Sequence, residues 1–343
     1  MSYHLKMKSI FAGLLGASVA FAAPVPDETR KIEVMLPMRD GTSLHTLIFL
    51  PRDHGENKTY TAIVDRSPYG YGDMEWLTDI FLPFGFVAVG QDLRGTEKSE
   101  GEWTLWQSDK DDSVDLGDWI VQQEWSNGQI MTLGASADGI ASLQTPTYAP
   151  EWLKAQYIIW APSDMYDIIM PYGDYKEETT EDWLYGLTMP NPDVVYDNIE
   201  TVYENEARTT YWDGIACSPE RYANVNFPSA FWAGWYDLFV VGTIEAFDGY
   251  NTMSHESVRY TSKITIDPLG HCLDGSDFFT ENVVEGRTLL VLAQVRRWVY
   301  GYTGCYMKWM ALCVIMLDLL LVLCLPCKSH AMLVDMQCGK HWQ

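Results

Sequence analysis

Three side chains that could together cleave an ester or amide bond are Ser136, Asp237 and His271, each placed just after a short apolar segment. A serine hydroxyl becomes an effective nucleophile when a base accepts its proton. Imidazole suits that role because it titrates near neutral pH. A carboxylate can hold the imidazole in the required tautomer and stabilise its charged form. These residue types therefore predict a catalytic triad of Ser136, His271 and Asp237.

The sequence around Ser136 reads "TLGASADGI", with a glycine two residues before the serine and another three residues after it. From ordinary Gly and Ser usage, such a match is expected by chance in about one chain in ten of this length. It also differs from the commoner G-x-S-x-G elbow, because Asp138 occupies the second position after the serine. The local pattern alone therefore leaves an ordinary turn serine as an alternative.

An acyl-transfer site also needs donors for the negative charge that develops on the substrate oxygen. The backbone N–H of Ala137, directly after the serine, is one candidate donor. The hydroxyl of Tyr69, in "DRSPYG" after another apolar segment, is the second. Asp138 has two interpretations. Its charge could oppose the oxyanion by about 2 kcal/mol at roughly 7 Å, or it could complement the dipole of a helix that begins at the elbow.

The elements that must position these residues alternate between short apolar strands and helices. "KIEVMLPMRDGTSLHTLIFL" (31–50) predicts a hairpin that turns at an Asp-Gly pair. Leu116, Trp119 and Ile120 have the spacing of one helical face within 112–124. Strands with continuous apolar character predict a mostly parallel sheet covered on both faces. The further predicted strands are 60–64, 86–89, 129–133, 155–160, 229–234 and 263–266.

Ligands bind beyond the carboxyl ends of the strands in an open parallel sheet. Tyr69, Ser136, Asp237 and His271 all follow predicted strands, so we expect them at one edge of the sheet. The triad members occur in the order Ser, Asp, His, which is the order of α/β-hydrolases. This order favours a catalytic reading of the serine more strongly than the local pattern does.

Several longer motifs carry a resemblance to a known family. They are "MRDGTSLHTLIFLP", "DRSPYGYG", "GQDLRGTEKSEGEW", "DLGDWIVQQEWSNGQIMTLGAS", "GWYDLF" and "DPLGH". Over residues 31–295 the chain resembles the cocaine esterase / X-prolyl dipeptidyl-peptidase (CocE/NonD) family of α/β-hydrolases. The resemblance implies Ser136, Asp237 and His271 as the triad and Tyr69 with Ala137 as the oxyanion hole. The family usually has tyrosine where this chain has Ala137, which puts the shape of the pocket in question.

The domain organisation expected from these observations is an α/β-hydrolase catalytic domain (23–149 and 226–300) with an inserted helical cap (150–225). The cap is rich in acidic residues. Its carboxylates could hold the free α-amino group of a substrate, or they could form a solvated helical face. The resemblance also implies a C-terminal β-sandwich, and the sequence after about residue 300 does not resemble one.

The two ends of the chain carry targeting signals or atypical sequence. Residues 1–22 predict a signal peptide, with two lysines before a 12-residue apolar run and alanines at a cleavage site, and hence secretion. Residues 301–343 form a hydrophobic, Cys-rich tail. Within it, 310–327 could anchor the chain in a membrane, although Asp318 interrupts the run. A shifted reading frame and a buried hydrophobic helix are the alternatives.

The composition and motifs limit which classes of ligand and cofactor we expect. A net charge of -24 argues against nucleic acid as a ligand. No metal-ligand cluster, phosphate loop or dinucleotide motif is evident, so we expect no cofactor. Whether Cys217 pairs with Cys272 stays open, as does the oligomeric state. The sequence thus predicts a secreted serine hydrolase that cleaves esters or Xaa-Pro dipeptides. The alternative is a catalytically silent binding or membrane-tethered protein with the same fold.

Overall fold

The computed structural model describes residues 30–271, apart from 52–54, 56, 72–74, 188–190 and 192. The chain divides into two compact units, Met1–Val291 and Leu292–Gln343, and all the described residues belong to the first. The predicted signal peptide (1–22), the tail (301–343) with its candidate anchor, and Cys272 all lie outside the described residues. The family's C-terminal β-sandwich, which the sequence predicts to be missing, would follow residue 300 and so also lies outside the described residues.

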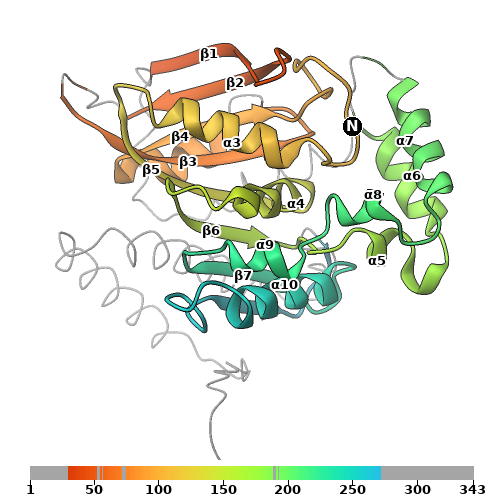
Figure 1. Cartoon of the computed structure of the whole chain (residues 1–343). Coiled ribbons are helices and arrows are strands. Elements are labelled where there is room, and N and C mark those ends of the chain that lie inside the picture. Colours follow the sequence, from red (N-terminus) through yellow and green to blue (C-terminus); the bar gives the residue numbers. More distant parts are fainter. Residues whose placement is uncertain are drawn as a thin grey trace, which may run out of the picture. The chain divides into compact units, whose positions relative to one another are not determined.

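An eight-stranded sheet with the order β1-β2-β4-β3-β5-β6-β7-β8 forms the centre of the fold (Figure 1). The first two strands pair antiparallel, β2 also pairs antiparallel with β4, and all pairs from β4 to β8 are parallel. The mostly parallel sheet predicted from the sequence is therefore confirmed. The strands are β1 (Arg30–Pro37), β2 (Ser43–Leu50), β3 (Tyr60–Ser67), β4 (Phe86–Asp92), β5 (Ser126–Ala135), β6 (Leu153–Ile159), β7 (Ser229–Gly234) and β8 (Lys263–Asp267).

Burial explains why these segments form strands. Every residue of β3 and β4 is buried, which is what helices on both faces of a parallel sheet require. The hairpin predicted at 31–50 is present as β1 and β2, in register from Arg30 opposite Leu50 to Pro37 opposite Ser43. Its turn contains Gly41 at φ +90°, and the Thr42 N–H donates to the side chain of Asp40 at 3.0 Å.

Helices cover the sheet, with α3 and α4 in front of it in Figure 1. The helix predicted at 112–124 is α3, which runs from Asp109 to Ile120. Its first turn contains three acidic residues, as the helix dipole favours. Core helices and short 3-10 turns are α2 (Glu75–Phe81), η1 (Leu82–Phe84), α3 (Asp109–Ile120), α4 (Ala137–Gln144), η2 (Thr145–Tyr148) and α10 (Val240–Thr252).

The cap helices lie between β6 and β7. The range predicted as the cap, 150–225, also contains β6, whose backbone pairs with β5 and β7 as part of the sheet. Its helices therefore occupy the later part of that range, and α6 and α7 lie at one end of the strands (Figure 1). They are α5 (Tyr166–Ile169), η3 (Pro171–Gly173), α6 (Glu177–Tyr185), α7 (Asp193–Glu204), α8 (Thr210–Asp213) and α9 (Pro219–Ala223).

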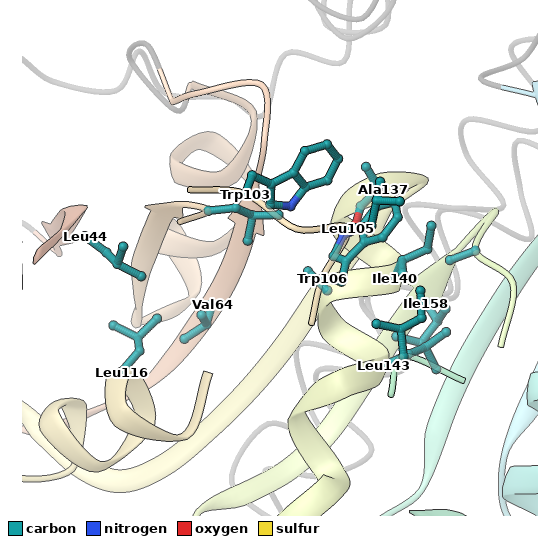
Figure 2. Close-up of a cluster of buried hydrophobic side chains, with 14 of the residues drawn as sticks. Leu44, Val64, Trp103, Leu105, Trp106, Leu116, Ala137, Ile140, Leu143 and Ile158 are labelled. Carbon is teal, nitrogen blue, oxygen red and sulfur yellow. The ribbon is translucent and has the colours of Figure 1, made fainter. Parts of the chain in front are cut away.

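One part of the hydrophobic core bears directly on the site. The loop between β4 and α3 carries Trp103 and Trp106, which are almost fully buried. Their rings meet edge to face with centroids 5.3 Å apart. Figure 2 shows Trp106 beside Ala137, the first residue of α4. The core thus continues up to the start of the helix that follows Ser136.

None of the helices within the described residues is both long and apolar enough to cross a bilayer.

Candidate active site

Ser136 stands on a sharp turn between β5, which ends at Ala135, and α4, which begins at Ala137. Its backbone has φ +60° and ψ −123°, a region that a non-glycine residue enters only at a cost of about 1–3 kcal/mol. The Ser136 N–H donates to the carbonyl of Ile159 on β6 at 2.8 Å, which holds the turn against the sheet. A strained strand–turn–helix serine is the geometry of a nucleophile elbow.

The two glycines near Ser136 are needed because strand and helix approach closely here. A Cβ at Gly134 would lie 2.3 Å from the carbonyl oxygen of Asp138. A Cβ at Gly139 would lie 2.6 Å from the Cβ of Ala161. The positions of the two glycines around Ser136 could arise by chance in a sequence, but in this chain close packing requires both of them.

The three predicted triad members meet at the carboxyl ends of their strands. His271 Nε2 lies 2.9 Å from Ser136 Oγ, and His271 Nδ1 lies 3.0 Å from Asp237 Oδ1. A carboxylate can only accept hydrogen bonds, so Nδ1 carries the proton and Nε2 can accept from the serine hydroxyl. Such an arrangement can withdraw the serine proton during attack on a carbonyl carbon.

Packing and further hydrogen bonds fix the imidazole of His271 and the carboxylate of Asp237. Asp237 Oδ1 also accepts the N–H of Phe239 at 2.7 Å, and the Asp237 side chain is fully buried. The ring of His271 contacts Phe239 edge to face with centroids 4.9 Å apart. On another side Trp160 lies 6.1 Å away, centroid to centroid. The imidazole is therefore held in one orientation by aromatic neighbours as well as by Asp237.

The two predicted oxyanion donors also lie at this edge of the sheet. Ala137 is the first residue of α4, where backbone N–H groups have no acceptor within the helix. Tyr69 follows β3, and its hydroxyl oxygen accepts the indole N–H of Trp183 at 2.8 Å. Trp183 belongs to α6 of the cap and was not among the predicted site residues. No spacing signal could reveal it, since 114 residues separate it from Tyr69.

Asp138 lies in the first turn of α4, where the helix-dipole interpretation expects it, and it is buried. Burial raises the pKa of the Tyr71 hydroxyl well above its usual value. The negative charges of Asp65, Asp138 and Asp92 raise it further. Burial likewise raises the pKa of Asp65. Asp138 is therefore part of an acidic cluster around the Tyr71 hydroxyl, together with Asp65 and Asp92. Sequence reasoning did not identify this cluster.

We find no group of three or more His, Cys, Asp or Glu residues arranged to bind a metal ion in the part of the chain that the structure describes.

Comparison with known proteins gives a family match over most of the described chain. The profile of the X-Pro dipeptidyl-peptidase (S15) family matches residues 40–273. The cocaine esterase of Rhodococcus sp. is 25% identical over 262 residues, covering 62% of this chain and 45% of that protein. A Bacillus anthracis protein provisionally named Xaa-Pro dipeptidyl-peptidase is 27% identical over 230 residues, covering 57% of this chain and 36% of that protein.

Among solved structures, a CocE/NonD family hydrolase of Staphylococcus aureus superposes with a TM-score of 0.55 at 19% identity. The match covers 77% of this chain and 49% of that one. This likeness supports the α/β-hydrolase fold. The chain spans less than half the length of these relatives.

Proposed function

The chain belongs to the X-Pro dipeptidyl-peptidase (S15) family of serine hydrolases, and we propose that it cleaves ester or amide bonds through a Ser136 acyl-enzyme. The observation that carries this proposal is the continuous path from the Asp237 carboxylate through the His271 imidazole to the Ser136 hydroxyl. The strained backbone of Ser136 supports it, because such strain clusters at active sites.

In the proposed reaction, Ser136 Oγ forms a bond to the substrate carbonyl carbon while its proton passes to His271 Nε2. The resulting oxyanion accepts hydrogen bonds from the Ala137 N–H and the Tyr69 hydroxyl. When the tetrahedral intermediate collapses, Nε2 returns the proton to the departing alcohol or amine. Water then attacks the acyl-enzyme while the same imidazole accepts its proton. This step releases the acid and restores the serine.

Two substrate classes fit this chemistry: Xaa-Pro dipeptides, and acyl or amino-acid esters. Both are represented among the names of the relatives. The acidic cap favours substrates with a free amino group, if its carboxylates contact the substrate. We further propose that the enzyme acts outside the cell, on the basis of the signal-like sequence at 1–22.

The test is covalent labelling of the purified chain with a fluorophosphonate probe. We expect stoichiometric labelling of the wild type, and none of Ser136→Ala. Ser257→Ala is the matched control, because Ser257 is exposed and far along the chain from the elbow; it should label normally. A folded wild type that stays unlabelled would support the catalytically silent alternative and contradict the proposal.

Hydrolysis of an Xaa-Pro anilide and of simple aryl esters, measured side by side, then separates the substrate classes. A peptidase should favour the anilide with a free amino terminus over the same compound with a blocked one. An esterase should turn over the aryl esters and show little response to blocking.

A further inference from the structure

Three tryptophans, Trp103, Trp106 and Trp183, form a packed group here called the tryptophan cluster. The rings of Trp106 and Trp183 stack, with centroids 5.6 Å apart and planes 10° from parallel. Trp103 meets Trp183 edge to face at 5.6 Å, and it meets Trp106 in the same way. Two of these residues come from the core loop after β4, and Trp183 comes from α6. The cluster therefore joins the catalytic core to the cap.

The cluster contacts both predicted oxyanion donors. The indole N–H of Trp106 donates to the carbonyl oxygen of Ala137 at 3.1 Å (Figure 2 shows the two side by side). The indole N–H of Trp183 donates to the hydroxyl oxygen of Tyr69 at 2.8 Å. One aromatic group thus fixes the residue that supplies the backbone donor and the residue that supplies the side-chain donor.

The direction of the Trp183–Tyr69 hydrogen bond has a chemical consequence. An indole N–H can only donate, so the Tyr69 oxygen is the acceptor and its own proton must point elsewhere. A hydroxyl that accepts a hydrogen bond is polarised into a better donor. Trp183 therefore both fixes the Tyr69 oxygen and strengthens the O–H that would face the oxyanion.

The backbone around the cluster is strained, and the cap makes a second contact with it in addition to that of Trp183. Leu105 and Trp106 have φ of +48° and +63°, in the left-handed region that non-glycine residues avoid. The side-chain amide of Asn198, on α7, donates to the carbonyl of Trp103 at 2.9 Å. Strain of this kind persists where the surrounding structure enforces one conformation. The position of the cluster is therefore enforced from both the core and the cap.

We propose that Trp183 is a positioning residue for the oxyanion hole, so that the cap supplies part of the catalytic machinery through Tyr69. This inference rests on the proposed function, since it assigns Trp183 a role in stabilising the oxyanion formed at Ser136. It differs from a role in substrate binding, because Trp183 would change the rate of the chemical step and leave ground-state binding largely unaffected.

The experiment compares kcat and KM for an aryl ester in four proteins: wild type, Trp183→Phe, Tyr69→Phe and the double variant. Phenylalanine keeps a ring for stacking on Trp106 but lacks the N–H. We expect Trp183→Phe to lower kcat about 10-fold, less than the roughly 100-fold loss of a direct donor. KM should change less than about two-fold. In the Tyr69→Phe background, Trp183→Phe should have no further effect, because the two act as a unit.

Trp212→Phe is the matched control. Trp212 is also a cap tryptophan, fully buried where Trp183 is half-buried, and its indole N–H donates to the carbonyl of Asn205 at 2.7 Å. Its substitution should lower thermal stability at least as much as Trp183→Phe but leave kcat unchanged. If Trp183→Phe lowers kcat equally in both Tyr69 backgrounds, or raises KM alone, the positioning role is overturned.

A readout independent of turnover is the indole N–H resonance of Trp183, assigned by its absence in Trp183→Phe. Tyr69→Phe removes the acceptor, so this resonance should move upfield; an unmoved resonance overturns the inference. A wild type without Ser136-dependent hydrolysis would instead overturn the proposed function, and the catalytic role of Trp183 with it. The two failures are therefore distinguishable.

Discussion

Asp237 Oδ1 accepts two hydrogen bonds, one from His271 Nδ1 at 3.0 Å and one from the Phe239 N–H at 2.7 Å. The backbone bond ties the carboxylate to the turn after β7, and burial excludes water from it. The carboxylate is thus held in place before the substrate arrives. In the proposed mechanism, holding the imidazole in this way makes it a directed proton acceptor for Ser136.

Asp237→Asn should lower kcat by about four orders of magnitude while the protein stays folded, because an amide at this position favours the wrong imidazole tautomer. Steady-state hydrolysis of an aryl ester measures the effect. Asp248→Asn is the matched control, since Asp248 is exposed on α10, and it should keep wild-type kcat. A loss smaller than about 10-fold for Asp237→Asn would remove Asp237 from the triad.

Tyr69→Phe should lower kcat by about 100- to 1000-fold with little change in KM, because it removes one donor to the oxyanion. The rate of fluorophosphonate labelling should fall in parallel. Tyr148→Phe is the control, since it also removes a tyrosine hydroxyl that has a side-chain partner; the Tyr148 hydroxyl donates to Asp111 on α3. Equal effects of the two substitutions would argue against an oxyanion role for Tyr69.

Gly134→Ala should destabilise the elbow by about 3 kcal/mol or more, because the added methyl would overlap backbone atoms that have little freedom to shift. Urea unfolding of the purified variant gives the change in the free energy of unfolding. Gly186→Ala is the control: a Cβ there would lie 3.3 Å from its nearest neighbour and φ is −79°. A Gly134→Ala protein as stable as Gly186→Ala would mean that β5 and α4 are less closely packed than described.

Asp65→Asn should stabilise the fold increasingly as pH rises. Burial raises the pKa of Asp65 in the folded chain above its unfolded value of about 3.9. Between these two values the unfolded state loses its proton and the folded state keeps it, so the wild type loses stability by up to about 1.4 kcal/mol per pH unit. The asparagine variant lacks this loss.

The free energies of unfolding of wild type and Asp65→Asn, measured from pH 4 to pH 8, test the direction of this pH dependence. The two should lie closest near pH 4, and the variant should gain relative to the wild type at each step above it. A constant gap across this range would show that Asp65 ionises alike in the folded and unfolded chains.

Apolar segments in the sequence predict where most strands of the sheet lie. The ends of the strands depend on contacts with residues far along the chain, which no local pattern reveals. β3 was predicted at 60–64, yet it continues through Asp65, Arg66 and Ser67. Arg66 can be buried because its guanidinium donates to Gln91 and to Asp109, which lie on β4 and α3. Those contacts join residues 25 and 43 positions apart, so only the folded chain shows that a charged segment belongs in the sheet.

The candidate site was likewise predictable only in part. The order of Ser136, Asp237 and His271 after three apolar strands pointed to their meeting place, because parallel strands share one carboxyl edge. The tryptophan cluster gave no comparable signal. Its members are joined by ring packing and by single hydrogen bonds across the core and the cap, and aromatic residues are frequent throughout this sequence.

His271, the proposed base, follows the shortest strand of the described sheet. His271 comes four residues after β8, a five-residue strand that stands last in the sheet order and pairs with β7. Detachment of this one strand would carry the imidazole away while the serine elbow, deep in the sheet, stayed intact. We would then expect warming or mild denaturant to abolish the proposed hydrolysis reversibly before the bulk of the molecule melts, since short segments open at lower free energy than a core does.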